Sequence, residues 1–379
     1  MKIVELTAFP LSFAVPEALQ VSLGIGRAVK RDAVLVRIVT DDGLVGWGEA
    51  HAGRAPSVIA ELLDSTLRPL VLGADAADID ALWARVYRVQ LASHGTGAAA
   101  ALALSGLDMA LWDLKAKAAG RPLHELLGGA PRELPAYAGG ISFGYGTLEA
   151  LLEETRETLA AGFRALKLRV GQDVATDVAR VRAVREAVGP EVDVLVDANC
   201  HYALDAAQRA RDAYAEFAVG WLEEPFPAPD FRSYRALGKA GVVPLAAGEN
   251  HYLRYDFERL ADDDVVTVWQ PDLSKCGGIT EALRIARLAA AHGIRVHPHT
   301  SVTGLNMAAT LHFLAAIPNG GYFEADWSRH NPLRSELCSP VIEVDATGCV
   351  RPPTAPGLGV EIDEAALARF PVLRGAGYL

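Results

Sequence analysis

The sequence lacks any long apolar run, and it contains few cysteines. Its richest apolar stretch, around Ala98–Leu104, soon meets Asp108 and is too short to span a bilayer. The N-terminal segment MKIVELTAFPLSF has no unbroken apolar core, so we predict neither a secretory signal nor a membrane anchor. The cysteines form no C-x-x-C pair, and they are Cys200, Cys276, Cys338 and Cys349. Free thiols in a chain of this length are typical of a reducing compartment, so we expect a cytoplasmic protein.

A basic tract is also missing. The chain carries 36 Lys and Arg against 47 Asp and Glu, a formal net charge of −11, so we predict no nucleic-acid partner. A hydrophobic fraction of 51% excludes a disordered chain and provides for a large core. The length of 379 residues indicates two domains.

The first 125 residues are predicted to form a small α+β capping domain. Val34–Val39 is a β-branched run that ends at the turn signal Asp41-Asp42-Gly43, and Leu44–Glu49 follows as a second strand. An Ala- and Leu-rich helical region comes next, in which we expect Ser105 to cap a helix and Gly120 to end it. The Pro- and Gly-punctuated C-terminal part, about residues 350–379, is expected to fold back and complete this domain.

Residues 126–349 show a different pattern, in which short apolar strands alternate with helical segments at intervals of roughly 25 residues. This pattern predicts an α/β fold, a (β/α)8-type or modified TIM barrel with one element missing or replaced. The alternative is a doubly wound open sheet, which would usually carry a Gly-rich phosphate loop that this chain lacks. The expected strands are Pro135–Gly139, Ala165–Arg169, Val194–Asn199, Gly220–Glu224, Leu245–Glu249, Val265–Asp272, Ile294–His299 and Tyr322–Asp326.

Acidic residues stand at three successive strand ends, where a barrel of this type carries its active site. Asp197, Glu223 and Glu249 are separated by equal intervals of 26 residues. Such carboxylates favour a hard cation, Mg²⁺ best, with Mn²⁺ or Ca²⁺ as alternatives. The opposing interpretation is that each acid is a helix cap or a surface charge. Glu223 and Glu224 must point in opposite directions, and the sequence alone does not decide which of them faces the site.

A possible base and a cationic pair end other strands. Asp272 and His299 lie 27 residues apart on neighbouring strands, so the carboxylate can orient the imidazole as a general base. Lys167 and Arg169 share one face and either pair with the rim acids or bind an anionic substrate. By the same parity, Asn199 accompanies Asp197 and His297 accompanies His299, and both are candidate substrate contacts.

With these residues placed, the whole chain resembles the enolase superfamily, in its mandelate racemase/muconate lactonizing enzyme branch. The similarity rests on the combination of motifs rather than on any one of them. They are Ser105–Gly129, Lys167-Leu168-Arg169 as a K-x-K-like motif, VDAN (196–199), EEP (223–225), GEN (248–250), QPDLSKCGG (270–278), HPH (297–299) and HNPLR (330–334).

The resemblance implies specific roles. Asp197, Glu223 and Glu249 would bind Mg²⁺, with Glu223 chosen over Glu224, and Asp272 and His299 would be the Asp–His dyad. Lys167 and Glu324 would lie near the carboxylate of the substrate, a small-molecule acid. The reaction would be abstraction of the proton α to that carboxylate, with Mg²⁺ stabilising the enediolate. The resemblance also implies a homo-oligomer, either a dimer or an octamer.

Two departures from the family pattern guide the choice of activity. Arg169 stands where the second Lys often acts as a base, and Asp272 stands where muconate-lactonizing enzymes place a catalytic Lys. A two-base racemase is therefore disfavoured, since arginine is a poor proton acceptor and Lys167 is the only possible second base on that side. Loss of water needs only one base, so we predict an acid-sugar dehydratase that acts on an aldonate or aldarate. A sugar-lactone cycloisomerase or a racemase/epimerase of the same branch is the alternative, and a non-catalytic binding or scaffold barrel is the alternative of a different class.

Substrate specificity is expected to lie in the capping domain. The segment Leu19–Lys30 and the loop after Glu49 are candidate lids over the barrel rim. Arg27, His51 and Arg54 would read distal hydroxyl groups or a second carboxylate, unless they are ordinary solvated residues.

Overall fold

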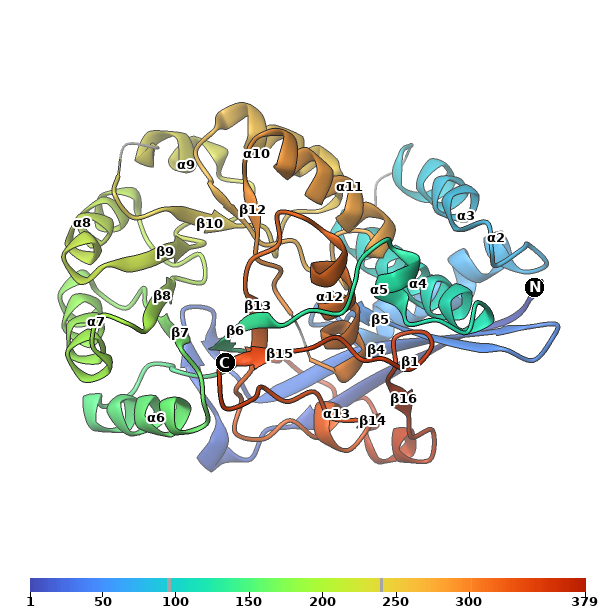
Figure 1. Ribbon diagram of the computed structural model, residues 1–379, viewed down its shortest axis with the longest axis horizontal. Helices are drawn as coiled ribbons and strands as arrows, with labels where there is room; N and C mark the ends of the chain where they lie inside the picture. The colour runs from blue at the N-terminus through green and yellow to red at the C-terminus, as the bar shows by residue number, and fades with distance from the viewer. Residues whose placement is uncertain (94–96, 239–240, 301) are drawn as a thin grey trace.

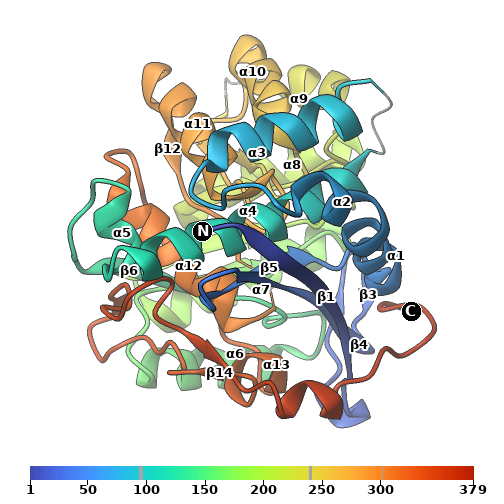
Figure 2. The ribbon, with the colours of Figure 1, turned by 90° about the vertical axis from the view of Figure 1, so that its right-hand side faces the viewer.

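The computed structural model describes residues 1–93, 97–238, 241–300 and 302–379. Its N-terminal part is an antiparallel sheet of three long strands with helices packed on it (Figure 2). The sheet order is β1 (Ile3–Ala14), β4 (Lys30–Thr40) and β5 (Val45–His51). The helices are α1 (Pro56–Glu61), α2 (Arg68–Val71), α3 (Ile79–Val86), α4 (Ala98–Ala118) and α5 (Leu123–Leu126), with π-helical turns at Leu62–Leu67 and Tyr87–Leu91.

Helix α4 is buried along most of its length and packs directly against β5. Gly48 of β5 and Gly106 of α4 permit this approach, because a Cβ built on Gly48 would lie 2.3 Å from the carbonyl oxygen of Gly106. The helix begins at Ala98, so the prediction that Ser105 caps it is wrong. Ser105 lies inside the helix, where its hydroxyl donates to the carbonyl oxygen of Ala101 at 2.7 Å. The helix ends before Gly120, as predicted, and this glycine has a φ of +61°.

The rest of the chain alternates strands and helices, as Figure 1 shows by the ring of helices outside the strands. Within the described residues, eight parallel strands follow the order β12-β11-β10-β9-β8-β7-β6-β13. They are β6 (Leu134–Gly139), β7 (Ala165–Arg169), β8 (Asp193–Asp197), β9 (Val219–Glu223), β10 (Leu245–Ala247), β11 (Val268–Trp269), β12 (Arg295–Val296) and β13 (Phe323–Asp326). The helices between them are α6 (Leu148–Ala160), α7 (Val174–Val188), α8 (Leu204–Tyr214), α9 (Phe231–Leu237), α10 (Leu253–Asp263), α11 (Gly278–Ala291) and α12 (Gly304–Ala316).

The two ends of this sheet meet. Val296 of β12 forms a single parallel bridge with Gly320, just before β13. Among the described residues, β12 and β13 are not otherwise paired. The helix that directly follows β13 is the short α13 (Pro332–Ser335), where a regular barrel would carry its eighth helix. The predicted modified (β/α)8 barrel is therefore confirmed.

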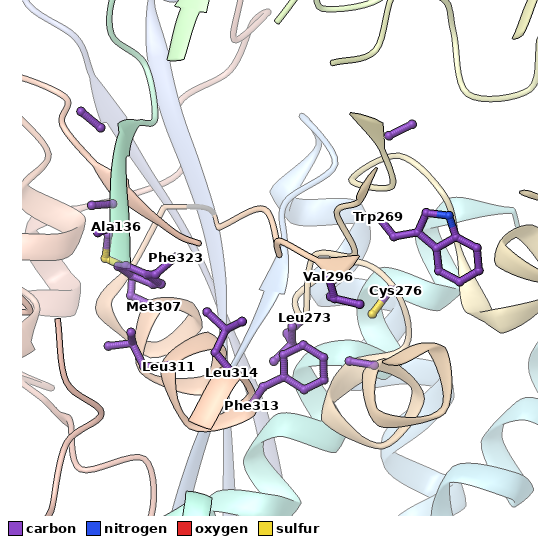
Figure 3. Close-up of a cluster of buried hydrophobic side chains, with 14 of the residues drawn as sticks. Ala136, Trp269, Leu273, Cys276, Val296, Met307, Leu311, Phe313, Leu314 and Phe323 are labelled. Atoms are coloured by element: carbon purple, nitrogen blue, oxygen red, sulfur yellow. The ribbon is translucent and has the colours of Figure 1, made fainter. Parts of the chain in front are cut away.

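The main core lies between the strands and their outer helices. Figure 3 shows Phe313 and Leu314 of α12 in a cluster with Leu273 and Val296 from the barrel. This packing fixes the strand ends that carry the polar residues of the site.

The C-terminal segment runs back over the N-terminal sheet. Phe370 accepts a backbone hydrogen bond from Ser12, and Arg27 and Leu379 exchange two backbone hydrogen bonds of 2.7 and 3.0 Å. These contacts lie beside the hairpin of β2 (Ser22–Leu23) and β3 (Gly26–Arg27). The expected boundary near residue 125 stays a prediction. None of the helices among the described residues has the length and apolar character required to cross a membrane.

Candidate active site at the carboxyl ends of the barrel strands

The side chains of His299 and Asp272 are hydrogen-bonded to each other. The imidazole Nδ1 lies 2.7 Å from Oδ2 of Asp272. The other oxygen, Oδ1, accepts hydrogen bonds from the backbone N–H and the hydroxyl of Ser274, at 2.7 and 2.6 Å, and from the amide of Asn306 at 3.1 Å. Asp272 is thus held rigidly, and it directs Nε2 of His299 away from itself.

Electrostatics around this pair favour an ionised carboxylate and a charged imidazole. Burial tends to raise the pKa of Asp272, but the hydrogen bond with His299 and the charge of that ring hold the pKa well below its usual range. Burial tends to lower the pKa of His299, yet the carboxylates of Glu249 and Glu324 raise it to about 9. Nε2 of His299 lies 3.2 Å from Oε2 of Glu249.

Two of the predicted ligand acids converge on one ammonium group. Asp197 of β8 and Glu223 of β9 are paired in register. Nζ of Lys167 lies 2.8 Å from Glu223 Oε1, 3.6 Å from Asp197 Oδ2 and 3.1 Å from Glu324 Oε1. All four side chains are almost fully buried. Lys167 therefore stands at the centre of three carboxylates.

Glu223 and Glu224 point in different directions, as strand parity predicts. Oε2 of Glu223 accepts hydrogen bonds from Trp221 at 3.1 Å and from Gln270 at 2.7 Å, inside the barrel. The carboxylate of Glu224 accepts from the amide of Asn250 and lines the cavity described below. Glu224 has a φ of +38°, a backbone conformation that turns its side chain out of the strand pattern.

Glu249, the third predicted ligand, pairs with two basic side chains. Oε1 of Glu249 lies 3.1 Å from Nζ of Lys275, and Oε2 faces His299. In the described part of the chain, no three His, Cys, Asp or Glu side chains are gathered closely enough to hold a metal ion as they stand. The donor set nevertheless fits Mg²⁺ chemically, since Asp197, Glu223 and Glu249 offer carboxylate oxygens at the ends of successive strands. In this structure their charges are balanced by Lys167, Arg169, Lys275 and His299.

Arg169, Asn199 and Glu324 complete this end of the barrel. Arg169 forms an ion pair with Asp197, donates to the carbonyl oxygen of Gly140, and lies 3.4 Å from Oδ1 of Asn199. Glu324 accepts from the backbone N–H of Gly140 at 3.2 Å. Although burial raises the pKa of Glu324, the charges of Lys167, His299 and Arg169 together outweigh burial and lower the pKa to about 2.

A cavity of about 440 Å³ opens above these strand ends. The barrel contributes His299, Glu249, Lys275, Arg169 and Asn199 to its lining. A volume of this size suits a small molecule.

The N-terminal part covers the cavity with several polar residues. His51 and Arg54 line it, and their contact with a substrate stays a prediction. The guanidinium of Arg54 lies 4.9 Å from the ring centre of Tyr378. Burial lowers the pKa of His51 to about 3, so its ring is neutral and Nδ1 accepts the N–H of Gly53 at 3.1 Å.

Two predicted substrate contacts lie elsewhere. Arg27 is exposed on the β2–β3 hairpin, and its backbone pairs with Leu379. His297 lies deeper in the barrel, where Nδ1 accepts the N–H of Tyr322 and the ring packs on Trp221 at 5.1 Å. His297 points into the barrel, as strand parity predicts, but it lies too deep along the strand to reach the cavity. The described lining of the cavity includes neither Arg27 nor His297.

The cavity also contains residues that the sequence analysis did not assign. Lys275 reaches Glu249 from the loop after β11, and Arg31 enters from the start of β4. Tyr378 comes from the C-terminal segment. Lys275 stands within the motif QPDLSKCGG (270–278), although no role was predicted for it. The sequence signal at Arg31 is a charged run, Lys30-Arg31-Asp32, before an apolar strand, and it does not reveal contact with the barrel.

Comparison with known families covers nearly the whole chain. A family model described as the mandelate racemase/muconate lactonizing enzyme N-terminal domain matches residues 8–128, and one described as enolase C-terminal domain-like matches residues 150–366.

Individual relatives are similar over comparable lengths. A D-galactarolactone cycloisomerase of Agrobacterium fabrum is 36% identical over 354 residues, which cover 90% of this chain and 92% of that protein. An arabinonate dehydratase of Saccharolobus solfataricus is 32% identical over 341 residues, covering 89% and 90%.

Solved structures agree with the fold. A member of the enolase superfamily from Polaromonas sp. JS666 is 52% identical, with a TM-score of 0.97 and complete coverage of both chains. A racemase from Streptomyces coelicolor A3(2) with bound magnesium is 33% identical, with a TM-score of 0.89 and coverage of 98% of this chain and 100% of that one.

Proposed function

Because the chain belongs to the mandelate racemase/muconate lactonizing enzyme family, we propose that it removes the proton α to the carboxylate of an acid sugar and then expels the β-hydroxyl as water. The observation that carries this proposal is the hydrogen-bonded pair of Asp272 and His299, whose imidazole lines the same cavity as basic groups suited to a carboxylate. Relatives named as dehydratases of arabinonate and D-galactonate support the substrate class.

His299 performs both proton transfers in this scheme. The carboxylate of Glu249 raises the pKa of His299, and a cation bound at Glu249 would cancel that effect and favour the neutral ring. Nε2 of the neutral ring accepts the α-proton, and Asp272 stabilises the imidazolium that forms. The electron pair of the broken C–H bond forms a double bond to the β-carbon, and the β-oxygen leaves with the proton carried by His299 as water. The enol product then tautomerises to a 2-keto-3-deoxy acid.

Asp197, Glu223 and Glu249 would hold a divalent cation, Mg²⁺ or alternatively Mn²⁺, which would supply positive charge to the substrate's carboxylate as the α-carbon loses its proton. The oxygen-only donor set supports this assignment, as does the magnesium in the related Streptomyces structure. Ligation would require the carboxylates to exchange their present contacts with Lys167, Arg169 and Lys275.

The remaining residues position the acid group. Arg169 and Asn199 lie on the cavity wall beside Asp197, and both carry hydrogen-bond donors for a carboxylate. Lys167 and Glu324 lie beneath them and set the local charge.

A single available base favours elimination over racemisation. Lys167 is fully buried among Glu223, Glu324 and Asp197, and arginine does not accept protons at neutral pH. His299 is therefore the base that faces the cavity among the residues proposed for the chemistry.

A sugar-lactone cycloisomerase is the second candidate. Two relatives, at 36% and 35% identity, carry cycloisomerase names. The same proton abstraction by His299 would then open a ring rather than release water.

A panel of aldonates, aldarates and their lactones, assayed with Mg²⁺ and with EDTA, tests the proposal. Release of a 2-keto-3-deoxy acid supports a dehydratase, and lactone consumption without it supports a cycloisomerase. Exchange of the α-proton with solvent deuterium without loss of water would indicate racemisation. A barrel that binds these acids but exchanges no proton would be a binding protein, and the proposed reaction would be wrong.

The state of the protein in the cell is also a proposal. We infer a homo-oligomer, a dimer or an octamer, in the cytoplasm, acting on a small-molecule carboxylate. Light scattering after size-exclusion chromatography and cell fractionation test these statements.

A further inference from the structure

Arg31 is a buried cation whose charge no side chain among the described residues neutralises. It stands at the start of β4, lines the active-site cavity and is 8% exposed. Among the described residues it makes no hydrogen bond or ion pair, and its buried Nε has no partner. Buried polar groups are nearly always hydrogen-bonded, and an unpaired buried charge is costly, so this guanidinium lacks a ligand.

The neighbouring charges do not supply one. Nζ of Lys30 lies 3.1 Å from Oδ2 of Asp32 and donates to the carbonyl oxygen of Leu373 at 2.8 Å. Oδ1 of Asp32 accepts from the hydroxyl of Ser12 at 2.6 Å. Lys30 and Asp32 therefore neutralise each other, and Arg31 leaves a net positive charge on this wall.

The other cations of the cavity are engaged. Arg169 and Lys275 pair with Asp197 and Glu249 on the barrel side. The guanidinium of Arg54 stacks on the ring of Tyr378. Arg54 is exposed, so solvent can reach its N–H donors, whereas Arg31 is the buried cation without a protein partner among the described residues that line the cavity.

We propose that Arg31 binds a second carboxylate at the far end of the substrate, so that the preferred substrates are sugar diacids, the aldarates, or their lactones. This inference rests on the proposed function and extends it. The planar guanidinium presents paired N–H donors that match a carboxylate, whereas a terminal hydroxyl would leave its charge unneutralised. The reacting carboxylate lies at the barrel strands, and Arg31 reads the opposite end of the chain.

The kinetic test compares galactarate with D-galactonate, which differ in whether carbon 6 is a carboxylate or a hydroxymethyl group. The unmodified protein should turn over galactarate, or its lactone, with the higher kcat/KM. Arg31→Met should lower kcat/KM for the diacid about 10- to 150-fold, mainly through KM, and change the value for the monoacid less than about threefold. Arg31→Lys should recover only part of the loss.

Arg37→Met is the matched control. Arg37 lies on the same strand, but it pairs with Glu5 and Glu364 at the surface, so its removal should leave the preference for the diacid unchanged. Equal losses with both substrates for Arg31→Met, or a preference for the monoacid or an aldonate 6-phosphate in the unmodified protein, would overturn the inference.

Binding separates this inference from the proposed reaction. His299→Asn should turn over substrate too slowly to disturb a titration, so calorimetry of this variant with Mg²⁺ measures affinity for galactarate and for galactonate. Tighter binding of galactarate, lost on adding Arg31→Met, supports the inference even if the unmodified protein proves to catalyse another reaction. Equal affinities would refute the role of Arg31, whereas turnover of monoacids alone would leave the proposed reaction standing.

Discussion

His299 and Asp272 are joined by a 2.7 Å hydrogen bond between Nδ1 and Oδ2. The bond fixes the imidazole so that its other nitrogen, Nε2, lies 3.2 Å from Glu249, one of the proposed cation ligands. The proposed base and the proposed cation site are therefore adjacent, as proton abstraction next to a bound carboxylate requires.

Replacement of the base gives the first prediction. His299→Asn should lower kcat about 10³-fold while the thermal unfolding midpoint stays within a few degrees, because general-base catalysis contributes about 10²- to 10⁴-fold. Steady-state assay of the best acid sugar, with circular dichroism of each variant, measures both effects. The exposed His292 provides the control, since His292→Asn should leave kcat unchanged. Retention of turnover by His299→Asn would show that another residue is the base.

Removal of the cation gives the second prediction. Dialysis against EDTA should abolish turnover, and Mg²⁺ or Mn²⁺ should restore it, because the developing charge on the substrate's carboxylate needs a counter-ion. Glu223→Gln should weaken activation by Mg²⁺ at least about tenfold, since carboxylates are the preferred ligands. Glu224→Gln is the matched comparison, and a larger effect there would assign the ligand role to Glu224. Activity insensitive to chelation would contradict the cation site.

The positions of the strand ends could be predicted from the sequence because each barrel strand is short, apolar and followed by a polar residue. The dyad and the three acids follow from this pattern, since parallel strands bring their carboxyl ends together. Lengths were less predictable: Val265–Asp272 was expected to be one strand, but β11 includes only Val268–Trp269. The residues after it turn into the loop that holds Asp272.

Contacts between distant segments account for what the sequence did not predict. Serine is a residue type that often caps helices, yet the helix continues through Ser105. Its hydroxyl also accepts a hydrogen bond from the backbone N–H of Gly277 in the barrel. Arg31 and Tyr378 lie 347 positions apart in the chain and line the same cavity. Local sequence patterns do not reveal such long-range contacts, whereas His299 and Asp272 lie one repeat apart, after neighbouring strands.

The C-terminal tail gives the third prediction. Deletion of residues 376–379 removes Tyr378 from the cavity wall and both backbone hydrogen bonds between Leu379 and Arg27. We expect kcat/KM to fall at least about tenfold, mainly through KM, because the wall loses its order and admits water. Leu379→Ala is the control, since that residue is 73% exposed and its backbone contacts remain. Unchanged kinetics after the deletion would show that the tail is not part of the site.

A buried histidine pair gives the fourth prediction. His124 and His312 lie 2.9 Å apart between their Nδ1 atoms, and burial lowers the pKa of His312 to about 4. Unfolded histidine titrates near 6.5, so the unfolded state binds the proton first as the pH falls. Above pH 6.5, His312 should therefore not affect the pH dependence of the free energy of unfolding. Between pH 6.5 and 4, protonation of His312 in the unfolded state should reduce that free energy by about 3 kcal/mol.

Urea unfolding at a series of pH values measures this dependence. His312→Asn should be less stable at pH 7, because the contacts with His124 and Leu358 are lost, but its stability should fall less steeply with acid. His292→Asn, at an exposed position, should keep the original slope. Equal slopes for all three proteins would mean that His312 does not resist protonation in the fold.

The close packing of α4 on β5 gives the fifth prediction. A Cβ added at Gly106 would lie 2.7 Å from Cγ2 of Val36 and 2.8 Å from the backbone nitrogen of Ala50. Alanine normally stabilises a helix relative to glycine by up to about 1 kcal/mol. Here the clash with backbone should outweigh that gain, so Gly106→Ala should destabilise the protein by about 1–3 kcal/mol, seen as a lower midpoint of urea unfolding. At Gly146 an added Cβ meets nothing within 4 Å, so Gly146→Ala should cost little. If Gly106→Ala raised the midpoint instead, α4 and β5 would be free to separate, and the approach of the N-terminal sheet to the barrel would be looser than the structure shows.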